Sequence, residues 1–274
     1  MSKRNSQTAK TAARERLRLE RERQAKRDKT KRQLIVAGSV VAVLAAAGGI
    51  GYAVVQSNKP GYWDAAKDKK LVKPANTSGA DGTTVVIGKS TAKKTLAMYE
   101  DPRCPACAQL EQNVGSTIKK DVEDGKFKIQ YIGASFLDDL IPGQGSRNTL
   151  SAMGAALNVS PEAFLQYKSA LYSTKWHPDE QDDKFKDDSY LIKVADTVPA
   201  LKNNTQFQQD VKKGTYDKWA LVMSKKFDTD GKKYKFSGTP TLMMDGKTVT
   251  GPDGKSAPST VADFNTAIDK ALKA

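Results

Sequence analysis

The chain has 274 residues and a net charge of +14, with 38% hydrophobic residues, 28% charged residues, two Cys and one His. This composition is globular on average and excludes collagen-like and wholly disordered chains. Three Cys and His residues cannot supply the four ligands of a tetrahedral Cys/His zinc site, and two Cys exclude a scaffold held by many disulfides.

The positive charge is concentrated in a basic tail, residues 1–32, which contains 13 Lys and Arg against four Asp and Glu. Nine of the 14 excess charges therefore lie in this tail, and the remaining 242 residues are only mildly cationic. We expect no nucleic-acid partner for the body of the protein, because its charge excess is too small to indicate one.

An uncharged, strongly apolar segment follows the tail, with 22 residues from Leu34 to Val55. As a helix it would reach about 33 Å, enough to cross the hydrocarbon core of a bilayer. A cleaved signal peptide or a buried helix is the alternative, but the run is longer than a signal core and no small-x-small cleavage site follows it. We predict a transmembrane helix over 33–56, with the basic tail cytoplasmic and the rest extracytoplasmic.

Residues 57–82 lack a sustained hydrophobic period and are predicted to form a linker with one short helix near 64–71. The domain predicted over 83–274 begins with strands at 83–87 and 95–100, a helix at 104–122 and a strand at 127–132. A strand–helix–strand order implies a parallel strand pair with a right-handed crossover.

The period then changes to a helical one over residues 145–228. Strands at 241–244 and 247–250 flank Asp245-Gly246, which is typical of a hairpin turn, and a helix is expected from about 259. The predicted fold class is therefore α/β with an all-helical insertion.

Both cysteines lie in one motif, Cys104-Pro105-Ala106-Cys107, directly after a strand and at the expected start of a helix. The positive end of a helix stabilises a thiolate, so we predict a lowered pKa for Cys104, near the exposed end, and a resolving role for Cys107. An inert structural disulfide or half of a metal site is the alternative. Disulfides persist outside the cytoplasm, where the predicted topology places the motif.

Two segments, EDPRCPACAQLE and GTPTLMMDGK, resemble the signatures of DsbA-like thioredoxin-fold oxidoreductases. The resemblance covers residues 83–274 and implies a thioredoxin-like fold whose helical insertion falls at 145–228. It implies that Cys104 and Cys107 form the active site and that Thr239 and Pro240 form a cis-proline loop facing the cysteines and binding substrate. An ordinary turn is the alternative for this loop. No cofactor or metal is implied.

The chain departs from this family at two positions. Many relatives have a buried acidic residue six positions before the first cysteine, where this chain has Met98. Glu100 or Asp101 is an available substitute. Strongly oxidising relatives have a His before the second cysteine, and Ala106 cannot donate a hydrogen bond as that His does, so we expect a less oxidising disulfide. The single histidine, His177, is expected to be a surface or packing residue.

The predicted function is a membrane-anchored, extracytoplasmic thiol–disulfide oxidoreductase that forms or exchanges disulfides in exported proteins. The resemblance implies exported protein thiols as substrates and a membrane redox partner that recycles the enzyme. A reductase or isomerase acting through the same site remains an alternative, as does a non-catalytic tethered adaptor that uses the fold as a scaffold.

Overall fold

The computed structural model describes residues 22–23, 26–27 and 61–274. The chain divides into two units, Met1–Gly61 and Tyr62–Ala274, and residues 22–23 and 26–27 of the first are helical. The predicted membrane span from Leu34 to Val55 lies outside the described residues, as does most of the predicted cytoplasmic tail. Within the described ranges, no helix is both long and apolar enough to cross a bilayer.

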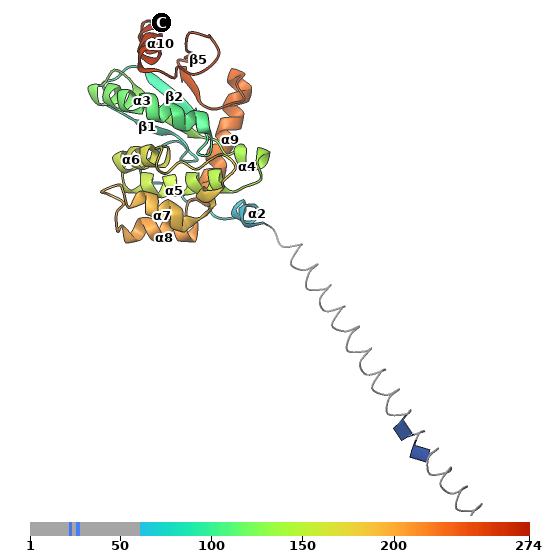
Figure 1. Ribbon diagram of the computed structural model, residues 1–274. Coiled ribbons are helices and arrows are strands. Elements are labelled where there is room, and N and C mark those ends of the chain that lie inside the picture. Colours follow the sequence, from blue (N-terminus) through green and yellow to red (C-terminus); the bar gives the residue numbers. More distant parts are fainter. Residues whose placement is uncertain (1–21, 24–25, 28–60) are drawn as a thin grey trace, which may run out of the picture. The chain divides into compact units, whose positions relative to one another are not determined.

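A mixed sheet with the strand order β1–β3–β2–β4–β5 forms the centre of the second unit (Figure 1). Its central strands β2 and β3 are parallel, whereas the other neighbouring pairs are antiparallel. The predicted strand–helix–strand unit is thus present, with α3 (Pro105–Asp124) joining β2 to β3. The strands are β1 Val85–Ile87, β2 Thr95–Glu100, β3 Lys128–Gly133, β4 Thr241–Met244 and β5 Lys247–Thr248.

Helix α3 begins and ends at residues suited to those positions. Cys104 precedes it with an extended backbone, and Pro105 occupies the first turn, where its missing N–H costs no hydrogen bond. Gly125 ends the helix with φ 81°, and its N–H bonds to the carbonyls of Asp121 and Val122. The Cys104–Cys107 motif is therefore fixed at a helix start by local sequence.

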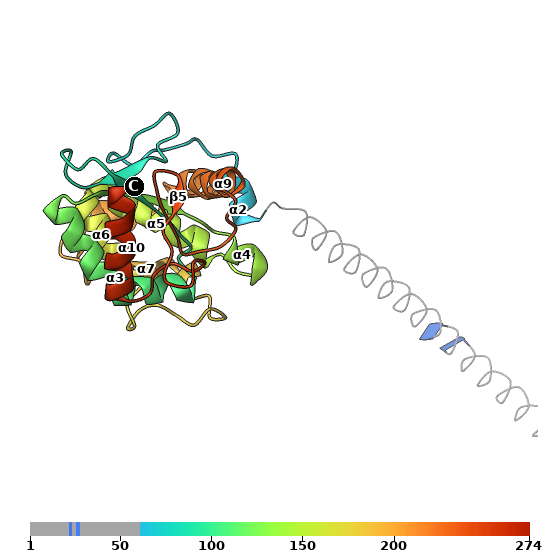
Figure 2. The same ribbon diagram turned by 90° about the horizontal axis from the view of Figure 1, so that it is seen from above.

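One face of the sheet is covered by α3 and by the C-terminal helix α10 (Val261–Lys273), which lie together in Figure 2. Burying each large apolar side chain there stabilises the fold by about 1.5–3 kcal/mol. The buried core on this face includes Leu96, Met98, Val114, Leu242, Phe264 and Ile268.

The other face is covered by the helical insertion, which packs as a larger core. Its helices extend beyond the predicted block at 145–228. Helix α9 continues past Phe227 and through Gly231. Only glycine fits at position 231, because a Cβ atom there would come 2.7 Å from the Phe236 carbonyl oxygen. The elements are α4 Leu137–Leu140, α5 Gly145–Val159, α6 Pro161–Leu171, the 3-10 turn Lys184–Lys186, α7 Asp188–Ala195, α8 Thr205–Lys213 and α9 Asp217–Tyr234.

Residues 62–82, which are most of the predicted linker 57–82, pack against this insertion. Helix α2 (Tyr62–Ala66) begins earlier than expected and contacts α9. The buried carboxylate of Asp217 accepts hydrogen bonds from the Tyr62 hydroxyl at 2.7 Å, the Lys69 ammonium at 2.8 Å and the Ser151 hydroxyl at 2.8 Å. This part of the chain therefore belongs to the folded unit.

Candidate active site

Cys104 immediately precedes α3 and Cys107 lies in the first turn of that helix, shortly after the central strand β2. The Cys104 N–H bonds to the Asp101 carbonyl at 2.9 Å, and the Cys107 N–H bonds to the Cys104 carbonyl at 3.1 Å. Both cysteines are free thiols here. Cys104 is 7% exposed and Cys107 is fully buried, so only Cys104 is open to a reaction partner.

Cys104 is more enclosed than the sequence suggested, because we expected its sulfur near an exposed helix end. It packs in a small cluster with Cys107, Ala108, Leu137 and Tyr172. Leu137 belongs to α4, a helix that no sequence pattern predicted, and Tyr172 follows α6 of the insertion. The insertion therefore narrows access to the sulfur.

The second predicted segment lies beside the first. The Thr239–Pro240 peptide bond is cis, and the Cys104 thiol donates to the Thr239 carbonyl at 3.4 Å. Pro240 immediately precedes β4, whose Thr241 pairs with Tyr99 on β2. The sheet register thus brings together two segments that are 135 residues apart in the chain.

The two thiols have opposite pKa shifts. The pKa of Cys104 is lowered to about 6, chiefly by a hydrogen bond from Cys107, with the Thr239 side chain and the N–H groups of Ala106 and Cys107 contributing against the effect of burial. The Thr239 hydroxyl oxygen has no hydrogen-bond partner beside the neutral thiol, so it is free to donate to a thiolate. Burial raises the pKa of Cys107 well above its ordinary value. Thiolate character therefore belongs to Cys104.

A buried acidic residue is present near the cysteines, although Met98 occupies the position where it was sought. Glu100 is fully buried, and burial raises its pKa to about 7 against the opposing charge of Lys168. The Lys168 ammonium lies 3.1 Å from Glu100 Oε2 and 2.6 Å from Glu111 Oε2. Glu100 Oε1 has no partner, so it has a free position for a proton.

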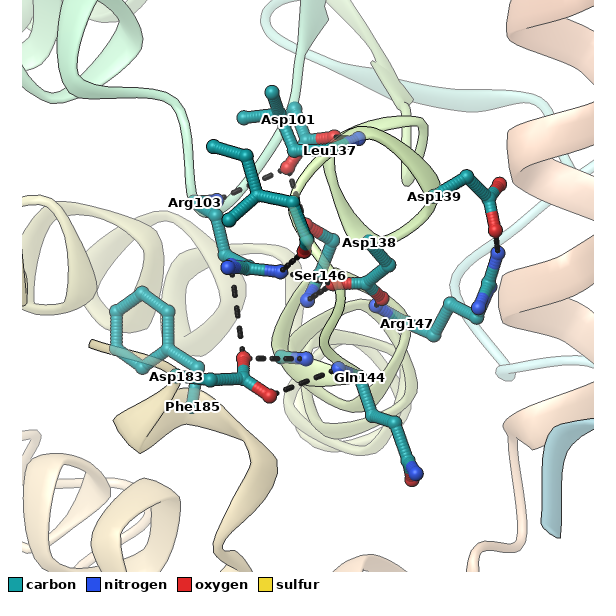
Figure 3. Close-up of polar contacts among 12 residues, drawn as sticks. Asp101, Arg103, Leu137, Asp138, Asp139, Gln144, Ser146, Arg147, Asp183 and Phe185 are labelled. Atoms are coloured by element: carbon teal, nitrogen blue, oxygen red, sulfur yellow. Dashed lines mark hydrogen bonds and ion pairs between the residues drawn. The ribbon is translucent and has the colours of Figure 1, made fainter. Parts of the chain in front are cut away.

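Asp101, the other candidate for the acid, holds the loop before Cys104 (Figure 3). Its Oδ1 accepts from the Arg103 N–H at 3.0 Å and from the Ser146 hydroxyl, and its Oδ2 accepts from the Leu137 N–H at 3.1 Å. Burial raises its pKa to about 7. Both carboxylate oxygens of Asp101 already accept hydrogen bonds, so this carboxylate holds the loop in place. Glu100 differs, because its Oε1 accepts no hydrogen bond.

Arg103 connects the loop before Cys104 to the insertion (Figure 3). Its side chain is 2% exposed, with Nη1 3.0 Å from Asp138 and Nε 3.6 Å from Asp183. These two aspartates also accept backbone N–H bonds at the start of α5, from residues 144 to 147. Both carboxylates are stabilised by their position at the helix N-terminus. Through these two aspartates, the buried Arg103 side chain joins the cysteine loop to the first turn of α5.

His177 packs against the same loop, although no sequence pattern placed it near the cysteines. Its Nε2 lies 3.0 Å from the Pro102 carbonyl oxygen, and its ring stacks on Tyr172 with centroids 5.8 Å apart. Burial lowers the pKa of His177, which favours a neutral ring donating to that carbonyl. Its geometry is that of a packing residue, as expected. Across the described part of the chain, no three His, Cys, Asp or Glu side chains are grouped to hold a metal ion.

Three charged residues near the cysteines were not predicted from the sequence: Lys168, Glu111 and Arg103. One pattern could have identified Lys168, because it lies four residues after Phe164 and three before Leu171, within the apolar stripe of α6. A lysine in such a stripe indicates a buried charge with partners. Arg103 and Glu111 had no comparable pattern, since their partners come from distant segments.

A model of the family described as thioredoxin matches residues 80–270. Disulfide bond formation protein D of Bacillus subtilis is 23% identical over 166 residues, which cover 60% of this chain and 68% of that protein. The serine/threonine-protein kinase PknE of Mycobacterium tuberculosis is 27% identical over 118 residues, 42% of this chain but only 21% of the kinase. The matched region thus spans about a fifth of that relative's length.

Solved structures share the fold of the second unit. Oxidised BdbD from Bacillus subtilis aligns with a TM-score of 0.55 at 20% identity, covering 74% of this chain and all of that one. Reduced DsbA from Mycobacterium tuberculosis aligns with a TM-score of 0.51 at 23% identity, covering 68% of this chain and all of that one. At these identities the likeness is one of fold.

Proposed function

The chain belongs to the thioredoxin family, and from this premise we propose that it is a thiol–disulfide oxidoreductase acting through Cys104 and Cys107. One observation carries the proposal: a buried cysteine pair at a helix start, with the Cys104 thiol 3.4 Å from the carbonyl of a cis Thr239–Pro240 loop and a pKa near 6. The name of the Bacillus subtilis relative, disulfide bond formation protein D, agrees with this activity.

The reaction begins from the Cys104–Cys107 disulfide. A substrate thiolate attacks Cys104 Sγ, a new sulfur–sulfur bond forms, and Cys107 leaves with the electron pair of the broken bond. The second substrate thiolate then attacks the substrate sulfur of the mixed disulfide, and Cys104 leaves. The substrate has lost two electrons and the enzyme has gained them. A low pKa makes Cys104 a good leaving group in the second step.

Thr239 and Pro240 are proposed to bind the substrate. Pairing to an extended substrate segment would use main-chain groups of this loop, in the way that an added strand pairs with a sheet edge. The Thr239 side chain is only partly exposed beside Cys104, so a bound segment would place its own sulfur next to the reactive one.

Glu100 is proposed to supply the proton that Cys107 needs on leaving. A Cys107 thiolate is poorly stabilised because the sulfur is fully buried, and a charge on Glu100 raises the pKa of Cys107 further. With a pKa near 7, Glu100 holds a proton for part of the time at neutral pH and can give it up. In the reverse direction its carboxylate takes the proton back, so the same group serves an oxidase, a reductase or an isomerase.

The test is disulfide transfer by the full chain, held in detergent micelles, to a reduced and unfolded model protein. The oxidised enzyme should lose its disulfide as the substrate gains one. Cys107→Ser should accumulate a mixed disulfide with substrate through Cys104, and Cys104→Ser should accumulate none. No transfer by the oxidised wild type, or unchanged biological function of Cys104→Ser, would instead favour a tethered adaptor.

The cellular setting is part of the proposal. The apolar segment from Leu34 to Val55 and the basic residues before it support a single-pass anchor with residues 57–274 extracytoplasmic. Substrates would then be exported protein thiols, and a membrane redox partner would reoxidise the cysteines. After reduction, a membrane-impermeant maleimide should label Cys104 in intact cells. Labelling only after lysis would contradict this topology.

A further inference from the structure

Tyr172 belongs to the cysteine cluster although it lies in the helical insertion. It directly follows α6, is 1% exposed, and belongs to the same buried cluster as Cys104 and Cys107. Its carbonyl accepts from the Gln112 side chain of α3 at 2.7 Å. The backbone of this residue is therefore tied to the same helix that begins with the redox motif.

The hydroxyl of Tyr172 is buried without a hydrogen-bond partner. Buried phenol hydroxyls usually find one, because leaving the group unpaired costs free energy. Two other fully buried tyrosines follow that rule: Tyr167 donates to the Leu191 carbonyl at 3.0 Å, and Tyr131 donates to the Met153 sulfur at 3.8 Å. The Tyr172 hydroxyl thus lacks a well-formed hydrogen bond, although it lies close enough to the Tyr131 hydroxyl to oppose the rise in the pKa of Tyr131.

The ring of Tyr172 is held in place from two directions. His177 stacks on it at an interplanar angle of 23°, and the Lys168 ammonium lies 5.1 Å from its centroid. Burial raises the pKa of Tyr172 well above its ordinary value, and charges on Tyr131, Glu100 and Cys107 raise it further. The phenol therefore stays protonated, and negative charge developing on Cys107 meets a fixed donor.

We propose that Tyr172 is a further catalytic residue, whose hydroxyl donates a hydrogen bond to the Cys107 sulfur as that sulfur leaves. This inference rests on the proposed function. In the step concerned, a thiolate forms a bond to Cys104, the Cys104–Cys107 bond breaks, and the electron pair goes to Cys107. A phenol donates a stronger hydrogen bond to a charged sulfur than to a neutral one, so this donor stabilises the transition state more than the ground state, which accelerates the step.

The test is Tyr172→Phe in the full chain, held in detergent micelles. The oxidised protein is mixed with a reduced peptide that contains one cysteine, quenched in acid, and resolved by mass spectrometry into oxidised, mixed-disulfide and reduced forms. Loss of one hydrogen bond to a charged sulfur should slow formation of the mixed disulfide about tenfold or more. In the reduced protein, the pH midpoint of Cys104 alkylation should stay near that of the wild type, which also shows that the site is intact.

Tyr167→Phe is the matched control, because it removes another fully buried hydroxyl, five residues earlier in the same helical segment and bound to Leu191 instead. It should leave the rate of mixed-disulfide formation unchanged. An unchanged rate for Tyr172→Phe, or equal slowing by both variants, would overturn the role of Tyr172 while leaving the proposed function standing. Absence of exchange in the wild type would overturn the proposed function itself.

Discussion

Replacing Cys107 tests why Cys104 ionises so readily. The hydrogen bond from Cys107 is the largest contribution to the lowered pKa of Cys104, which falls to about 6 from 9.0. A hydrogen bond to a charged group contributes about 1.5–3 kcal/mol, or roughly one to two pKa units. Cys107→Ala should therefore raise the pKa of Cys104 to about 7–8, whereas Cys107→Ser keeps a donor and should leave it near 6.

The same ionisation should stabilise the reduced protein in a pH-dependent way. Because the folded-state pKa is lowered, the contribution is complete above the unfolded pKa of 9.0 and is lost as the pH falls through about 6. A difference of about three pKa units contributes about 4 kcal/mol to the free energy of unfolding above pH 9. Between about 1 and 2 kcal/mol of this stabilisation remains at pH 7. At pH 7 this makes the disulfide more oxidising by roughly 30 mV.

Two measurements check these values in the full chain. The rate of Cys104 alkylation by iodoacetamide, followed against pH, gives the pKa of Cys104 in the wild type and in both Cys107 variants. Denaturant unfolding of the reduced wild type and of Cys104→Ser, from pH 5 to 9, gives the free energy of unfolding of each protein at each pH. A wild-type alkylation midpoint near 9, or equal midpoints for Cys107→Ala and Cys107→Ser, would refute a Cys107 hydrogen bond as the cause of the lowered pKa.

Three further predictions concern buried charges. Glu100→Gln should slow disulfide exchange and remove the part of its pH dependence centred near 7, as measured by exchange rates from pH 5 to 9. Arg103→Met would leave Asp138 and Asp183 without their buried cation, and urea unfolding should show a loss of about 3–5 kcal/mol. Asp217→Asn should loosen residues 62–82, so limited proteolysis should cut them sooner than in the wild type.

The outcomes that contradict these three predictions are distinct. Retention of the pH dependence near 7 in Glu100→Gln would assign it to another group. A loss under about 1 kcal/mol in Arg103→Met would mean that the arginine contributes no more than an exposed ion pair. Equal cleavage rates within residues 62–82 in Asp217→Asn and the wild type would show that the Asp217 hydrogen bonds do not hold the segment.

Much of the fold follows from local patterns. The strand 95–100 and the start of the next helix at Pro105 agree closely with the sequence, because apolar alternation and a proline in the first turn act within a few residues. α4 was missed because four residues give no period, and α9 was predicted too short because Asp228 to Gly231 has turn-forming composition. There, tertiary packing against Phe236 overrides local propensity.

The candidate active site likewise has features that local sequence predicts and features that only tertiary packing decides. Its cysteines were proposed from a short motif and the Thr239–Pro240 segment from a family resemblance, and the structure places the two segments side by side. The sequence offered both Glu100 and Asp101 as the buried acid but did not decide between them, because their proton-accepting positions depend on Lys168, Ser146 and distant backbone N–H groups. A charge or hydroxyl acquires its pKa and its partner from whatever packs around it, and that is decided only when segments far apart in the chain come into contact.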